Sequence, residues 1–114
     1  LAAALQGITL RARDNKLTLD DVQGGTFTLN NTGALGSTIS QPIINFPQAA
    51  ILTTEAIQKR PVVRDDAIAI RSMMFLSLTF DHRALDGVPA GEFLGAVKAK
   101  LEDPGWMASN GAEG

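Results

Sequence analysis

The residues with the clearest chemical potential lie in one short stretch, Asp81-His82-Arg83-Ala84-Leu85-Asp86-Gly87. His82 is the only histidine of the 114-residue chain, and Asp86 follows it four positions later. Histidine ordinarily titrates at about pH 6.5, so at neutral pH it can take a proton from a reacting group and return it. A thiol is mostly protonated at that pH, so a base beside it creates the nucleophile during attack. The stretch therefore indicates either general-base catalysis by His82 or a histidine that only supports a turn.

Two long strands are expected to position this stretch. The stretches at 49–63 and 67–80 have the pattern of strands and are joined by the polar connection Arg64-Asp65-Asp66, which predicts an antiparallel hairpin. In the second run the even-numbered side chains from Ile68 to Phe80 are apolar except Ser72, which predicts that this face is buried. The odd-numbered face is mixed, as expected of a surface that meets a neighbouring subunit or a substrate channel.

A helix is expected after the stretch, at 88–102. Its apolar side chains recur at helical spacing from Ala90 to Leu101, Pro89 suits a first turn, and Pro104-Gly105 is expected to end it. Asp86 then has two possible roles: it can cap this helix, because aspartate is a preferred N-cap, or it can support the histidine.

The preceding part of the chain is expected to begin with a helix over residues 1–14. A short strand is predicted at 26–30, with Phe27 and Leu29 on one face, followed by a loop rich in Gly, Ser and Thr at 33–41. Residues 108–114 are predicted to be a disordered tail.

Composition excludes several classes of function. The chain has no cysteine and a single histidine, which argues against disulfides, thiol nucleophiles and a metal site. The net charge is −2 and there is no basic stripe, so nucleic acid is not an expected partner. No apolar run reaches the roughly 18 residues that a membrane helix needs, so no membrane association is expected.

Four segments in order resemble the E2 acyltransferases of the 2-oxo acid dehydrogenase complexes. They are the Asp-His-Arg-x-x-Asp-Gly stretch at 81–87, Gly-Gly-Thr-Phe-Thr-Leu-Asn-Asn-Thr-Gly at 24–33, Pro-Ile-Ile-Asn at 42–45 and Pro-Gln-Ala-Ala-Ile-Leu at 47–52. The resemblance implies that residues 1–107 form the C-terminal part of a single catalytic domain. It also implies an α/β, chloramphenicol-acetyltransferase-like fold, with a mixed β-sheet and helices packed on one face.

The resemblance further implies a reaction, acyl transfer between dihydrolipoamide and coenzyme A. His82 would be the general base and Asp86 would fix the geometry around it. Asn30 stands where many family members have a serine whose hydroxyl stabilises the oxyanion. The side-chain amide of Asn30 can donate a hydrogen bond in the same way. The alternative is that Asn30 is only a turn residue. Coenzyme A would be a substrate, the lipoyl group would belong to a domain outside this chain, and no metal would take part.

The implied partners are two further copies of the chain, in a homotrimer that builds a larger core, together with the E1 and E3 components and lipoyl domains. The segment around Asn30 and the stretch at 59–63 are more similar to branched-chain or generic 2-oxo acid members than to pyruvate-specific ones. The expected compartment is the bacterial cytoplasm, with the mitochondrial matrix as the alternative. Lys59, Arg60 and Arg64 are either contacts for coenzyme A phosphates or solvated charges, and no cofactor-binding residue is assigned.

Two other functions fit the same fold. An antibiotic acetyltransferase usually has a second histidine before the catalytic one, where this chain has Asp81. A non-catalytic core scaffold would have no need of His82.

Overall fold

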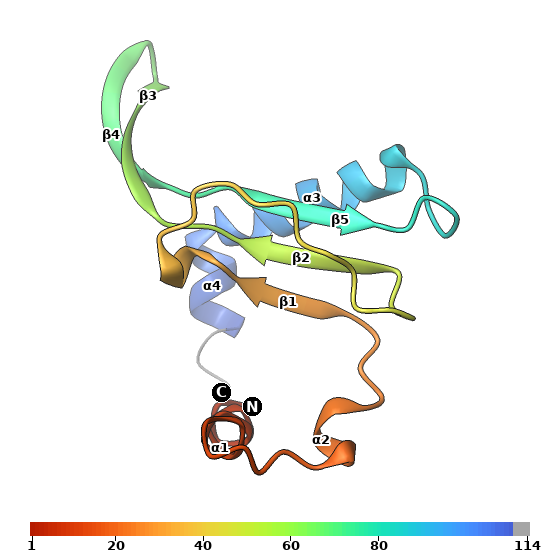
Figure 1. Ribbon diagram of the computed structural model, residues 1–114. Helices are drawn as coiled ribbons and strands as arrows, with labels where there is room; N and C mark the ends of the chain where they lie inside the picture. Colours follow the sequence, from red (N-terminus) through yellow and green to blue (C-terminus); the bar gives the residue numbers. More distant parts are fainter. Residues whose placement is uncertain (111–114) are drawn as a thin grey trace. The chain divides into compact units, whose positions relative to one another are not determined.

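The computed structural model describes residues 1–110 (Figure 1). Its elements in chain order are α1 (Ala2–Arg13), α2 (Leu19–Val22), β1 (Thr28–Asn31), the short 3-10 helix η1 (Gly33–Leu35), β2 (Ala50–Thr54), β3 (Gln58–Arg64), β4 (Ala67–Met73), β5 (Leu76–Phe80), α3 (Gly87–Leu101) and α4 (Pro104–Asn110). The chain divides into two compact units, one made of residues 26–94 and the other of residues 1–25 with those from 95 onward. The first unit carries all the predicted site residues.

A mixed three-stranded sheet forms the centre of this unit, in the order β1-β2-β5. β1 runs parallel to β2, and β5 runs antiparallel to it, so the sheet is mixed as predicted. The register aligns Asn30 of β1 with Thr53 of β2, and Thr53 with Ser77 of β5. Because directly paired residues share a face, these three polar side chains form one row across the sheet.

The two faces of the sheet differ in chemistry. One face carries Leu52 and Leu78, and beside it the ring of Phe27 packs on Phe93 of α3 with 5.9 Å between ring centroids. The opposite face carries the polar row and lies against the segment 41–48. There the Thr28 hydroxyl donates to Oε1 of Gln48 at 2.5 Å.

The predicted hairpin is present but interrupted. β3 and β4 pair antiparallel, and β2 and β5 pair antiparallel below them, with breaks at 55–57 and 74–75 (Figure 1). Asp65 and Asp66 connect β3 to β4 with φ of 50° and 59°. Positive φ at both central residues is the backbone conformation of a type I′ hairpin turn, whose twist matches that of the flanking strands.

The prediction that the even-numbered face of the second strand is buried is wrong over β4. Ile68 and Ile70 are 80% and 68% exposed, whereas Leu78 and Phe80 of β5 are half-buried. The even-numbered alternation is real, but β3 and β4 form a separate two-stranded sheet, and no layer covers that face within residues 1–110. Alternation shows which side chains share a face, not what lies against it.

In the second unit, α1 is confirmed at Ala2–Arg13. α2 begins with a capping box, in which the Thr18 hydroxyl accepts from the Asp21 amide and the Asp21 carboxylate accepts from the Thr18 amide. Arg11 donates to the same carboxylate at 2.6 Å and holds the pKa of Asp21 well below its usual range.

The C-terminal prediction is wrong for its first part. Pro104 and Gly105 follow the end of α3 as expected, but Pro104 then begins α4, whose first turn is capped by Oδ1 of Asp103. Residues 108–110, predicted as the start of a disordered tail, belong to this helix. Residues 111–114 lie outside the described part of the chain.

Candidate active site

The backbone around His82 is held at both sides of the residue. Asp81 continues the strand pairing beyond β5, because its amide donates to the carbonyl of Ala49 at 2.8 Å. The Asp81 carboxylate accepts from the Arg83 amide at 2.9 Å and from its guanidinium Nη2 at 2.7 Å. Arg83 thereby lowers the pKa of Asp81 to about 2. Asp81 and Arg83 thus form a local ion pair that stabilises the turn.

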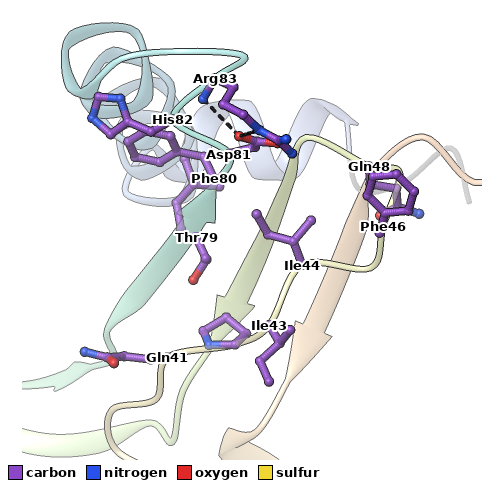
Figure 2. Close-up of a pocket in the computed structure, with 12 residues that line it drawn as sticks. Gln41, Ile43, Ile44, Phe46, Gln48, Thr79, Phe80, Asp81, His82 and Arg83 are labelled. Carbon is purple, nitrogen blue, oxygen red and sulfur yellow. Dashed lines mark hydrogen bonds and ion pairs between the residues drawn. The ribbon is translucent and has the colours of Figure 1, made fainter.

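The imidazole of His82 projects from this turn and is 75% exposed. Its ring lies beside that of Phe80, with 5.5 Å between centroids, and is turned away from Ile44 (Figure 2). Nδ1 lies 3.4 Å from Oδ1 of Asp86. A carboxylate on the Nδ1 side orients the ring and leaves Nε2 as the nitrogen that can meet a substrate.

Asp86 directly precedes α3, and its carbonyl accepts from the Ala90 amide at 3.3 Å, as the residue before a helix does. Its backbone thus starts the helix while its carboxylate lies near His82. The carboxylate therefore lies where the second role, support of the histidine, requires it, and it is the backbone carbonyl that begins the helix.

Asn30 does not join this pair within the chain. It lies in the row with Ser77, and Asp81 is four residues further along, which corresponds to roughly 13 Å of extended strand. β1 and β5 are also separated by two strand spacings, about 10 Å. His82 projects beyond the opposite end of the sheet from Asn30. The structure therefore brings together two of the three predicted site residues and places the third elsewhere.

An open hollow of about 820 Å³ lies between β5 and the segment 41–48. Its lining comprises Gln41, Pro42, Ile43, Ile44, Phe46, Gln48, Leu78, Thr79, Phe80, Asp81, His82 and Arg83 (Figure 2). The wall from the segment 41–48 is largely apolar, which suits a flexible thioester chain better than a charged group. The sequence analysis used residues 42–45 only as one of the matched segments and gave them no place at the site.

The structure also shows a residue that sequence reasoning missed, Glu55. It follows β2 and is only 2% exposed. The available signal was its position, because it is the only charged residue between Val22 and Lys59. A lone charge in such a run indicates either an exposed edge or a specific buried partner set.

No group of three or more histidine, cysteine, aspartate or glutamate side chains could hold a metal ion among the described residues. Lys59, Arg60 and Arg64 lie on β3 and do not line the hollow beside His82. Their role toward coenzyme A stays a prediction.

Solved structures of acyltransferases share this fold. A probable dihydrolipoamide acetyltransferase from Listeria monocytogenes superposes with a TM-score of 0.83 and 54% identity, covering 86% of this chain and 42% of that one. A second structure is a dihydrolipoamide acetyltransferase from Azotobacter vinelandii, in which a serine, a histidine and an asparagine were studied for their roles in the catalytic mechanism. It superposes with a TM-score of 0.85 and 37% identity, covering 90% of this chain and 42% of that one. These neighbours confirm the predicted acyltransferase fold class.

Sequence relatives point the same way. The lipoamide acyltransferase component of the branched-chain alpha-keto acid dehydrogenase complex of Bacillus subtilis is 57% identical over 103 residues, which are 90% of this chain and 24% of that protein. The succinyltransferase component of the 2-oxoglutarate dehydrogenase complex of Bartonella vinsonii is 55% identical over 93 residues, 82% and 23% respectively.

The chain belongs to the family of 2-oxoacid dehydrogenase acyltransferases, whose catalytic-domain model matches residues 1–108. It spans about a quarter of the length of these curated relatives. The resemblance seen in the four sequence segments is thereby confirmed.

Proposed function

We propose that the protein containing this chain transfers an acyl group between dihydrolipoamide and coenzyme A, as the E2 core of a 2-oxo acid dehydrogenase complex. The observation that carries the proposal is the His82–Asp86 pair, held at the end of β5 beside an apolar-walled hollow, in a chain of this family. Similarity to the Bacillus subtilis protein favours a branched-chain acyl group.

The spacing of the three predicted residues supports their roles. In the Azotobacter vinelandii acetyltransferase, the serine studied lies 52 positions before the histidine, and the asparagine lies four positions after it. Asn30 and Asp86 stand at the same two separations from His82. The equal separations support the assignment of Asn30 to the position of the serine and of Asp86 to that of the asparagine.

The chemistry follows from these roles. Nε2 of His82 accepts the proton of the attacking thiol as the sulfur adds to the thioester carbonyl. The Asn30 amide donates to the oxyanion of the tetrahedral intermediate. Collapse of the intermediate breaks the original carbon–sulfur bond, and the departing thiolate takes the proton back from the imidazolium. Asp86 holds the ring and balances its positive charge during these steps.

The separation of Asn30 from His82 favours a site shared between copies of the chain. Such a site needs a closed assembly in which the β5 end of one copy meets the β1 end of the next, and a trimer provides this geometry. The exposed apolar face of β4 is consistent with surface that an assembly covers. A homotrimer that builds a larger core is therefore part of the proposal.

The remaining partners follow from the function. Coenzyme A and lipoyl groups carried on separate domains would be the substrates. The E1 component would acylate the lipoyl group, and the E3 component would reoxidise the dihydrolipoyl group. Of the helices described, none combines the length and apolarity needed to cross a membrane. We place the protein in the bacterial cytoplasm, with the mitochondrial matrix as the alternative, because relatives of both origins exist.

The direct test is an assay of the full-length protein with coenzyme A and acylated dihydrolipoamide. Isobutyryl, acetyl and succinyl forms are compared at equal concentration, and we expect thioester exchange with the highest kcat/KM for the branched acyl group. Chloramphenicol is offered as an alternative acceptor and is expected to remain unmodified. No thioester exchange with any acyl group would overturn the proposal, and acetylated chloramphenicol would favour the antibiotic acetyltransferase.

A further inference from the structure

Glu55 is a buried carboxylate that the reaction described above does not use. Its two oxygens accept from two hydroxyls, Oε1 from Ser40 at 2.5 Å and Oε2 from Thr32 at 2.7 Å. The two hydroxyl oxygens lie 3.4 Å from each other. Both distances to the carboxylate fall in the range of hydrogen bonds to an ionised oxygen.

This arrangement needs a charged carboxylate. Both hydroxyls donate to it, and only a carboxylate accepts at each of its two oxygens, whereas the amide of a glutamine accepts at one. The ion pairs within residues 1–110 do not include Glu55. The hydrogen bond from Ser40, with that from Thr32, holds the pKa of Glu55 below its usual range. A buried charge that has no ionic partner within residues 1–110 is costly to keep for packing only.

The hydroxyls belong to the loop that leaves the strand carrying Asn30. Thr32 lies two residues beyond Asn30, and its amide donates to the carbonyl of Thr54 at 3.2 Å. A Cβ added to Gly33 would lie 2.3 Å from the carbonyl carbon of Glu55, so the loop backbone is seated directly on this residue. The Ala56 amide completes the attachment by donating to the Ser37 carbonyl at 2.7 Å.

We propose that Glu55 is a positioning residue that fixes the end of β1, and with it the Asn30 amide, through Thr32 and Ser40. The inference rests on the proposed function, in which Asn30 donates to the oxyanion. Glu55 touches neither the substrate nor the reacting atoms. Glu55 instead places the Asn30 amide, whose stabilisation of the oxyanion changes when the amide moves by a few tenths of an ångström.

A double-mutant cycle in the full-length protein tests this. Glu55→Gln is expected to lower kcat by about 10-fold, while KM for coenzyme A stays within about twofold, because an oxyanion donor acts only in the transition state. In an Asn30→Ala background, the same change is expected to lower kcat by less than about twofold, since the donor that it positions is already absent.

Thr32→Val serves as the second variant, because it removes one donor with little change of shape and leaves the carboxylate in place. It is expected to repeat the pattern of Glu55→Gln, and it decides the test if Glu55→Gln does not fold. The matched control is Thr18→Val, which removes a hydroxyl that donates to the Asp21 carboxylate at 3.0 Å. That change is expected to weaken α2 without altering kcat.

The proposal is overturned if kcat of the deciding variant stays within about twofold of the unaltered enzyme. It is equally overturned if the loss is as large in the Asn30→Ala background as in the wild-type background, because Glu55 would then act on folding or on another group. Both results require an active enzyme. Failure of the proposed function would appear instead as absence of thioester exchange in the unaltered protein.

Discussion

Replacement of His82 by alanine is expected to lower the rate of acyl transfer by at least about 10²-fold, the lower range of what a positioned general base contributes. The chain offers no second histidine or cysteine that could take over. Because the side chain is 75% exposed, its removal should leave folding and oligomer size nearly unchanged. Steady-state kinetics of the full-length variant, with its mass in solution, give the measurement.

A matched control is Lys98→Ala, which removes one partner of another exposed pair, formed between Lys98 of α3 and Glu102 just beyond its end. This variant should keep full activity. Near-normal turnover in His82→Ala would show that His82 only supports its turn, and the acid–base assignment would be abandoned.

The second large effect is expected at Asn30. Asn30→Ala should lower kcat by about 10²-fold, the usual loss when one oxyanion donor is removed. Asn30→Ser should retain most of the activity, because a hydroxyl at this position can donate to the same oxygen, as in family members that carry serine there. Since the donor acts in the transition state, both variants should keep KM for coenzyme A nearly constant.

The role of the Asn30 side chain is tested by the difference in rate between the two variants. The backbone carbonyl of Asn30 accepts from the Thr54 hydroxyl at 3.4 Å and is retained in both, so their difference reports on the side chain. Equal rates for Asn30→Ala and Asn30→Ser would reduce Asn30 to a turn residue.

Much of the secondary structure could be predicted because it is local. The 3.6-residue periodicity located α1 and α3, and alternation with the polar connection Arg64-Asp65-Asp66 located the hairpin. The breaks at 55–57 and 74–75 were not predicted, because they depend on which strands pair and where the sheet ends. The exposure of Ile68 and Ile70 was missed for a related reason, since burial of a face depends on what other chains or elements cover it.

The candidate site was predictable in part. The spacing of His82 and Asp86 places them at a strand-to-helix junction, and the structure brings them to 3.4 Å. The position of Asn30 at the far end of the sheet follows from the parallel pairing of β1 with β2, a long-range contact that local patterns do not encode. Glu55 was missed because its hydroxyl partners lie 15 and 23 positions earlier in the chain.

The central claim is that one active site takes its base from one copy of the chain and its oxyanion donor from another. Complementation tests it directly. The full-length His82→Ala and Asn30→Ala variants are each nearly inactive by expectation. They are mixed in equal amounts, dissociated, reassembled together, and shown by mass to form mixed oligomers before activity is measured.

If the sites are shared, some interfaces pair an intact His82 with an intact Asn30 of the neighbouring copy. In randomly mixed rings this holds for about one site in four, so activity should return to roughly a quarter of the wild-type value. If both residues act within one chain, every site keeps one defect. Mixed oligomers that remain as inactive as the two separate variants would contradict the account.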